Sequence, residues 1–261
     1  MNSLKSILLI FTLSTISSYS QGLLMSSEET NTAEIFDVLS GVDNENYNNY
    51  KKKAFEAFEK KKYFTCLVAI KDAQSFFNDN IDLVYLQGVC HALIEDADKA
   101  IEYYEKALKM NQNHSYTLMN IIEINYFDER YEEVVKYINK VNTIVENYNQ
   151  PPLPLLDFKL ITSLSKLSET DPEKYKDEMN KVIKKYTYMD DNPFHYYSNA
   201  LKLYVAGDKQ EARAWIMKAY RIFQKNGFLK NWNKALIDTG YLDTHELKFA
   251  HGSMFKRPKA K

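Results

Sequence analysis

The stretch from Leu86 to Leu108, LQGVCHALIEDADKAIEYYEKAL, decides the fold of this chain. Its two apolar halves are separated by the polar turn EDAD, and small residues stand at Gly88, Ala100 and Ala107. Small side chains let two helices approach closely, and Asp96 is a favourable residue immediately before a helix. The stretch therefore predicts two α-helices, joined by a short turn and packed tightly against each other.

The same pattern recurs outward from this stretch with a period of 34 residues, the distance from Ala54 to Gly88 and from Gly88 to Ile122. The matching positions of three consecutive units are Ala54, Tyr63, Cys66, Ile70 and Ala73, then Gly88, Ala97, Ala100, Tyr104 and Ala107, then Ile122, Tyr131, Val134, Ile138 and Val141. A later unit restores the spacing with Ala200, Leu203, Gly207, Ala212, Ile216 and Ala219. An irregular unit, with helices expected over 155–167 and 172–185, follows the proline-rich stretch 149–154. A fixed period of this length indicates a repeat architecture.

With these in-phase units the chain resembles the tetratricopeptide repeat (TPR) family, in which each unit is a pair of antiparallel helices. The resemblance implies an all-α, right-handed superhelical solenoid of about five units over 47–224. The units are expected near 47–80, 81–114, 115–148, 155–190 and 193–226. A capping helix and its extension are expected over 228–250, because the last apolar face of a solenoid needs a cover. A polar segment over 21–46, in which 33–39 could form a short helix, and a basic tail over 251–261 lie outside the repeats.

The first 20 residues have the features of a secretory signal peptide. Lys5 precedes the apolar run 7–16, and Ser18 and Ser20 are small residues at the spacing that a signal peptidase requires. We expect cleavage before Gln21 and an exported bacterial protein, periplasmic or extracellular, with no membrane span in its mature form. An uncleaved anchor is the alternative, although the run is shorter than the roughly 20 apolar residues of a membrane helix.

The composition excludes several functional classes. The 34 Lys and Arg balance 35 Asp and Glu to a net charge of -1, which argues against the basic surface that nucleic-acid binding requires. The 7 Gly and 6 Pro are too few for collagen or for an all-β chain rich in tight turns. No GxGxxG, GxxxxGK[ST], HExxH, CxxC or GxSxG motif occurs, and the 5 His form no close metal-ligand pair. The sequence therefore predicts no enzyme activity, no cofactor and no metal site.

The two cysteines, Cys66 and Cys90, are expected to be buried free thiols that take the place of alanine in the core. The repeat register predicts that they lie on neighbouring helices about one turn out of step. A disulfide requires Cα atoms within about 7 Å, so this register argues against a disulfide.

Apolar side chains rich in tyrosine recur on one side of the first helix of successive units. The TPR resemblance implies that these helices line a concave groove, which would bind an extended or helical peptide. Tyrosine suits such a site because it combines a large contact area with a hydroxyl group. The candidate groove residues are Tyr85, Val89, Leu93, Tyr116, Met119, Glu123, Tyr126, Tyr197, Leu201 and Tyr204. Alternatively, these side chains pack between adjacent first helices and stabilise the solenoid.

These features predict a non-enzymatic scaffold or adaptor of the cell envelope, which binds a protein or peptide partner in the groove. Two alternatives stay open. The first is an accessory or divergent enzyme that uses the groove as a substrate cleft. The second is a structural spacer whose groove is filled by its own side chains or by its C-terminal segment.

Overall fold

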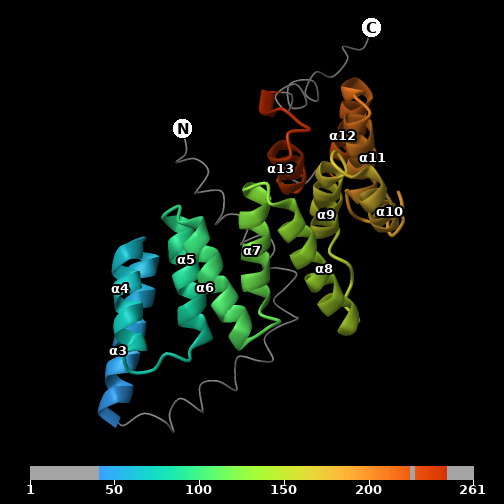
Figure 1. The fold of residues 1–261 in the computed structure, drawn as a ribbon. Coiled ribbons are helices and arrows are strands. Elements are labelled where there is room, and N and C mark those ends of the chain that lie inside the picture. Colours follow the sequence, from blue (N-terminus) through green and yellow to red (C-terminus); the bar gives the residue numbers. More distant parts are fainter. Residues whose placement is uncertain (1–40, 224–226, 246–261) are drawn as a thin grey trace. The chain divides into compact units, whose positions relative to one another are not determined.

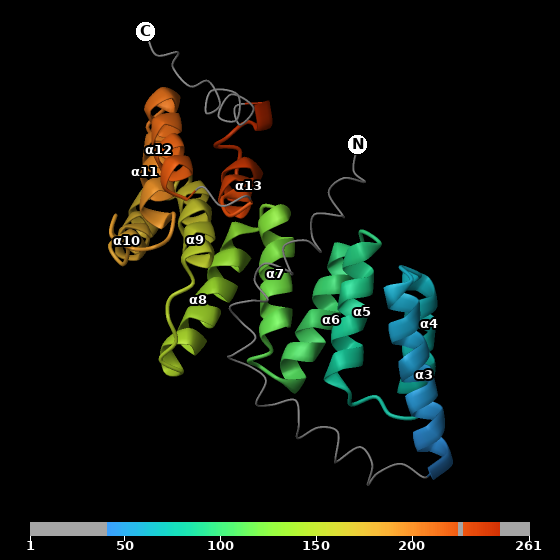
Figure 2. The same ribbon diagram turned by 180° about the vertical axis from the view of Figure 1, so that it is seen from behind.

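The computed structural model describes residues 41–223 and 227–245, which form α-helices and turns and contain no strand. The helices follow one another along the chain, as Figure 1 and the view from behind in Figure 2 show. Their bounds are α3 (Gly41–Glu59), α4 (Tyr63–Gln74), α5 (Ile81–Leu93), α6 (Ala97–Met110), α7 (Ser115–Phe127), α8 (Tyr131–Asn147), α9 (Pro154–Leu167), α10 (Pro172–Ile183), α11 (Phe194–Val205), α12 (Lys209–Ile222) and α13 (Lys230–Asp238). The expected signal peptide, the segment 21–40 and the basic tail lie outside the described residues.

Consecutive helices pair into hairpins. α3 packs on α4, α5 on α6, α9 on α10 and α11 on α12. The turns within these pairs are short, as at 60–62 and 94–96, so the paired helices run antiparallel. The chain is therefore an all-helical, TPR-like solenoid. A short turn at 128–130 likewise joins α7 to α8. The first helix of each consecutive pair (α3, α5, α7, α9 and α11) is termed an A helix below, and the second a B helix.

The chain divides into two compact units between Ile124 and Asn125, within α7. The first unit contains α3 to α6 and most of α7. The second unit contains the end of α7 and the helices α8 to α13.

Four hairpin turns pass through the same left-handed backbone conformation. The φ angle is 56° at Lys61, 65° at Glu95, 60° at Glu129 and 84° at Gly207. The residue after each donates its N–H to a carbonyl of the preceding helix: Lys62 to Ala57 (2.9 Å), Asp96 to His91 (2.9 Å), Arg130 to Asn125 (2.8 Å) and Asp208 to Leu203 (2.9 Å). These bonds close a Schellman motif. The chain thus reverses at the same repeat position each time, and only at Gly207 is the left-handed conformation free of steric cost.

Aspartate side chains cap three of the helices. Asp96, Asp171 and Asp208 each accept a hydrogen bond from a backbone N–H in the first turn of α6, α10 and α12. Helix α8 has Arg130 at its N-cap position and no side-chain cap. Asp128 forms an ion pair with Arg130 at 3.1 Å.

Gly88 allows the close approach of α5 and α6. A Cβ atom at Gly88 would lie only 2.5 Å from both Cδ1 and Cε1 of the Tyr104 ring. Tyr104 is 1% exposed, and its hydroxyl accepts a hydrogen bond of 3.0 Å from Nδ2 of Asn120. Ala100 and Ala107 are completely buried on the same B helix. Glycine is therefore needed at position 88 because the Tyr104 ring fills the space between the helices.

Cys66 and Cys90 are free thiols, completely buried in the core shared by α3, α4 and α5. The contact with the Cys66 thiol, together with burial, raises the pKa of the Cys90 thiol. The expectation that the two side chains lie a turn out of step is therefore wrong. The axial offset between consecutive hairpins is set by their packing, which the sequence period does not specify.

Helix α9 is the central helix of the second unit and packs against α8, α10, α11 and α13. Its buried residues are Leu156, Asp157, Phe158, Lys159, Leu160, Ile161, Thr162, Ser163, Leu164, Ser165 and Leu167. The buried Asp157 carboxylate accepts hydrogen bonds of 2.8 Å from Nδ2 of Asn142 and 2.8 Å from Oη of Tyr186. The Lys159 ammonium lies 5.0 Å from the ring centre of Tyr126. These partners offset the cost of burying two charged side chains.

Candidate functional site

An aromatic cluster in the first unit consists of Tyr85 on α5, His114 immediately before α7 and Tyr116 at the start of α7. The centroid of the Tyr85 ring is 5.8 Å from that of Tyr104, 5.3 Å from that of His114 and 6.3 Å from that of Tyr116. Nδ2 of Asn120 donates to Oη of Tyr85 at 3.2 Å. Tyr85, His114 and Tyr116 are half-buried, whereas Tyr104 and Asn120 are buried beneath them. The cluster therefore exposes aromatic surface above a fixed, hydrogen-bonded base.

Burial disfavours the charged forms of Tyr85, Tyr104 and His114. Burial raises the pKa of Tyr85 to about 12 and raises the pKa of Tyr104 well above its ordinary value. Burial lowers the pKa of His114, although the nearby Asp82 carboxylate opposes this effect. Nδ1 of His114 lies 2.6 Å from Oγ1 of Thr117. A ligand of this surface would therefore meet apolar and hydrogen-bonding groups.

The candidate groove residues of the first unit lie at two depths. Tyr85, Leu93 and Tyr116 retain exposed surface. The buried members are Val89 (7% exposed), Met119 (9%) and Glu123 (8%). Among the candidate groove residues of this unit, the accessible ones are thus Tyr85 and Tyr116 of the aromatic cluster together with Leu93.

The candidate groove residues of the second unit are all buried: Tyr126 (1% exposed), Tyr197 (0%), Leu201 (1%) and Tyr204 (6%). Oη of Tyr126 lies 2.7 Å from Oγ1 of Thr162 and donates to the carbonyl oxygen of Ala235 at 2.9 Å. Burial raises the pKa of Tyr126 well above its ordinary value, so the hydroxyl keeps its proton at neutral pH. These tyrosines therefore make contacts inside the chain.

Helix α13 packs against the A-helix side of the second unit. The Trp232 ring lies 5.2 Å from that of Phe158 on α9 and 5.4 Å from that of Tyr197 on α11. The Asn233 side chain accepts a hydrogen bond from Oη of Tyr197 at 2.6 Å and donates one to Oη of Tyr220 at 2.6 Å. The helix expected to cover the end of the solenoid thus contacts the tyrosines expected to bind a partner.

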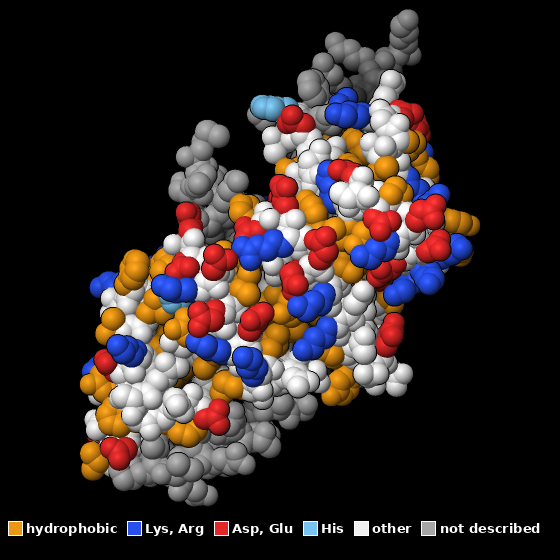
Figure 3. Space-filling model, viewed as in Figure 1, with side chains coloured by type: hydrophobic (Ala, Val, Ile, Leu, Met, Phe, Trp, Pro, Cys, Tyr) orange, Lys and Arg blue, Asp and Glu red, His pale blue; other side chains and the backbone are white. Residues whose placement is uncertain are grey.

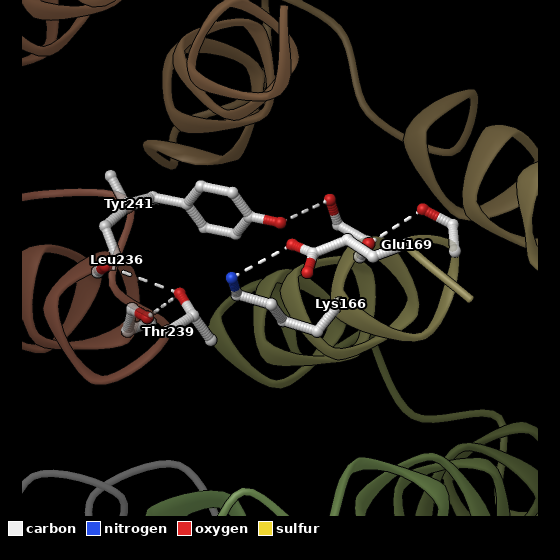
Figure 4. A network of polar contacts seen from close by, with 8 residues as sticks. Lys166, Glu169, Leu236, Thr239 and Tyr241 are labelled. Carbon is white, nitrogen blue, oxygen red and sulfur yellow. Dashed lines mark hydrogen bonds and ion pairs between the residues drawn. The ribbon is translucent and has the colours of Figure 1, made fainter. Parts of the chain in front are cut away.

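The residues after α13 also bind to α9, as Figure 4 shows. Oη of Tyr241 lies 2.8 Å from Oγ of Ser165, and the Lys166 ammonium lies 4.6 Å from the centre of the Tyr241 ring. Lys166 also pairs with Glu169 at 3.0 Å. Oγ1 of Thr239 donates to two carbonyls of the last turn of α13, at 2.8 and 3.3 Å. The carbonyl groups in the last turn of α13 therefore have hydrogen-bond partners, and Tyr241 attaches the following residues to α9.

Sequence reasoning missed the polar base of the aromatic cluster and the polar contacts of α13. Asn120 and Thr117 are buried polar residues within an otherwise apolar segment of α7. Buried polar residues generally have hydrogen-bond partners, so Asn120 and Thr117 in the sequence could have predicted a buried hydrogen-bond network. The pairing of Asn233 with two tyrosine hydroxyls had no local signal, because its partners lie on other helices.

Charged side chains of both signs are intermingled on the face shown in Figure 3, with hydrophobic side chains between them.

Over residues 41–223 and 227–245, no group of three or more His, Cys, Asp or Glu is placed to hold a metal ion. Among the helices of this described part, none is both long and apolar enough to cross a membrane.

No protein-family model matches the chain. A TPR repeat-containing protein of the archaeon Methanocaldococcus jannaschii is 25% identical over 202 residues, which is 74% of this chain. The chain spans only about a third (34%) of the length of that protein. This distant similarity and the all-helical hairpin structure together support a TPR-like family.

Proposed function

We propose that the chain is a non-enzymatic protein-interaction scaffold, and that the aromatic cluster of the first unit binds a segment of a partner protein. The observation that carries this proposal is the half-buried aromatic surface formed by Tyr85 on α5, His114 immediately before α7 and Tyr116 on α7. Exposed aromatic side chains fixed by a rigid scaffold are favourable anchors, because little conformational entropy is lost on binding. Leu93 on α5 extends this surface with an aliphatic side chain.

The similarity to a TPR repeat-containing protein supports the class of function. TPR-like hairpins present successive A helices to a ligand, and protein segments are the ligands that suit such helical surfaces. Nucleic acid is a poor candidate, because the chain has a net charge of -1.

We further place this scaffold in the cell envelope or outside the cell. The support is the apolar run 7–16 behind Lys5, followed by small residues up to Ser20. The N-terminal sequence of the protein isolated from its own cells should begin at or near Gln21. An intact Met1 in the membrane fraction would contradict export with cleavage.

The binding proposal is tested by a photo-reactive amino acid placed at Tyr116. Tyr103 is the matched control, because it is a half-buried tyrosine on the B helix α6, stacked on His91 at 5.2 Å. Crosslinking in the native extract should join one defined partner peptide to position 116 and not to position 103. Tyr116→Ala should then weaken the purified complex by about thirtyfold, as truncation of an aromatic anchor does, with Tyr103→Ala close to wild type.

Melting of both variants separates binding from folding. If Tyr116→Ala and Tyr103→Ala bind equally well while both remain folded, the aromatic cluster is not the site. A second candidate function, a structural spacer, is favoured by the contacts of α13 with Tyr126 and Tyr197. The spacer predicts that no position on the A helices crosslinks to a partner.

A further inference from the structure

We propose that the A-helix side of the second unit is a binding site for an amphipathic helix, that α13 is its resident ligand, and that a partner helix with the same order of side chains exchanges with α13. The inference rests on the proposed function in that the chain binds protein segments, and it names the class of segment. It concerns the second unit, so its test is separate from the test of the aromatic cluster.

All three A helices represented in the second unit supply contacts to α13. Tyr126, at the end of α7, donates to the Ala235 carbonyl at 2.9 Å. Phe158 of α9 contacts the Trp232 ring at 5.2 Å. Tyr197 of α11 contacts the same ring at 5.4 Å and also donates to the next residue of α13 at 2.6 Å. A single short helix therefore lies against the side of the hairpins on which a TPR-like solenoid presents its A helices.

Part of this recognition is independent of side chains. The Ala235 carbonyl lies in the last turn of α13 and accepts a hydrogen bond from the backbone N–H of Thr239, the C-cap residue, at 3.3 Å. It also accepts hydrogen bonds from Oη of Tyr126 at 2.9 Å and from Oγ1 of Thr239 at 2.8 Å. Tyr126 is 1% exposed, so water does not compete for its hydroxyl. The site therefore recognises the C-terminal end of a helix.

The side chains of α13 specify the rest of the ligand. Trp232 is 4% exposed and Leu236, one turn later on the same face, is completely buried. Asn233 accepts from Tyr197 and donates to Tyr220, as an amide side chain can, because it carries both an acceptor oxygen and a donor NH₂ group. The ligand is thus a helix with an aromatic residue, an adjacent asparagine, and a small residue and a leucine in the following turn.

Helix α13 can exchange with another helix because its own helical structure depends on docking. It has 9 residues, fewer than the roughly 12–15 at which an isolated helix becomes marginally stable in water. A short tether joins it to α12, and Gly227 in that tether has a φ of 83°. A tether of this kind holds a ligand at an effective concentration on the order of millimolar. A partner helix therefore displaces α13 when its affinity and concentration are high enough to outcompete the tethered helix.

The experiment measures binding of a labelled synthetic peptide of residues 228–242, FLKNWNKALIDTGYL, to the full-length protein by fluorescence anisotropy. In full-length Asn233→Ala, the resident helix loses two hydrogen bonds while Tyr197 and Tyr220 remain available to the peptide. The peptide should bind this variant at least about tenfold more tightly than wild type. Lys230→Ala, which changes an exposed residue of the same helix, should bind the peptide as wild type does.

Two further variants keep the outcome decisive. Trp232→Phe weakens the resident helix through its ring contacts, so it replaces Asn233→Ala if that variant fails to fold. Tyr126→Phe, added to either variant, should reduce peptide affinity, because the hydroxyl that contacts the helix end is removed. The proposal is overturned if the peptide binds folded Asn233→Ala or Trp232→Phe no more tightly than wild type, or if Tyr126→Phe leaves that binding unchanged. Either result leaves the crosslinking at Tyr116 in the first unit unaffected.

Discussion

Replacement of Gly88 by alanine should destabilise the first unit, even though alanine is the better helix former. The new Cβ atom would lie 2.5 Å from two atoms of the Tyr104 ring, well inside van der Waals contact. The ring has little room to move, because it contacts Tyr85 and its hydroxyl is hydrogen-bonded to Asn120. Relief of the clash therefore requires a shift of the α5–α6 hairpin or loss of that hydrogen bond.

The change in the free energy of unfolding follows from one stabilising and two destabilising contributions. The intrinsic gain from Gly to Ala within a helix is about 1 kcal/mol. Overpacking of a dense core costs about 1–3 kcal/mol, and loss of the Tyr104–Asn120 hydrogen bond costs about 1 kcal/mol more. The free energy of unfolding should therefore fall by about 1–3 kcal/mol. For a chain of this size that lowers the Tm by about 3–10 °C.

Urea and thermal unfolding, followed by circular dichroism, measure this loss, and hydrogen exchange locates it in α5 and α6. Gly41→Ala is the matched control, because a Cβ at Gly41 meets nothing within 4 Å. Gly88→Ala combined with Tyr104→Leu should lose less stability than the two single changes added together, since the clash needs both side chains. The reasoning is refuted if Gly88→Ala is as stable as wild type, or if the double variant is strictly additive.

Three other predictions concern the turns, the thiols and the pH dependence. Glu95→Gly should raise the free energy of unfolding by about 0.5–1 kcal/mol, because glycine adopts the left-handed conformation without steric cost. Gly207→Ala should lower the free energy of unfolding by about 1 kcal/mol for the converse reason. Urea unfolding of both variants checks the sign of each change. Cys66 and Cys90 should resist a thiol reagent such as Ellman's in the folded protein and both react in denaturant, so labelling of either in the native state would show that the core opens readily. Because the folded pKa of Tyr85 is raised from 10.0 to about 12, its contribution to stability should be complete below pH 10 and be lost as the pH rises towards 12. Unfolding at fixed urea between pH 8 and pH 12 should show this decline, and Tyr85→Phe should reduce it.

The sequence by itself determined the helical hairpins and their small contact positions. The 34-residue spacing of Ala54, Gly88 and Ile122 predicted the repeats, because the same packing problem recurs at each hairpin. Gly88 was also readable, since only a missing side chain leaves room for a large ring on the facing helix. These features are local, and each depends on residues within one hairpin.

Contacts between hairpins were decided only by the tertiary structure. The period predicted that Cys66 and Cys90 were out of step, whereas packing of α4 on α5 brings both thiols into one core. The same pattern placed Tyr85 and Tyr197 at equivalent positions of their A helices, yet Tyr85 is half-buried and Tyr197 is covered by α13. The difference arises because periodicity specifies which face of a helix a side chain occupies. What lies against that face depends on a segment far away in the chain, and its docking follows from shape and hydrogen bonding in three dimensions.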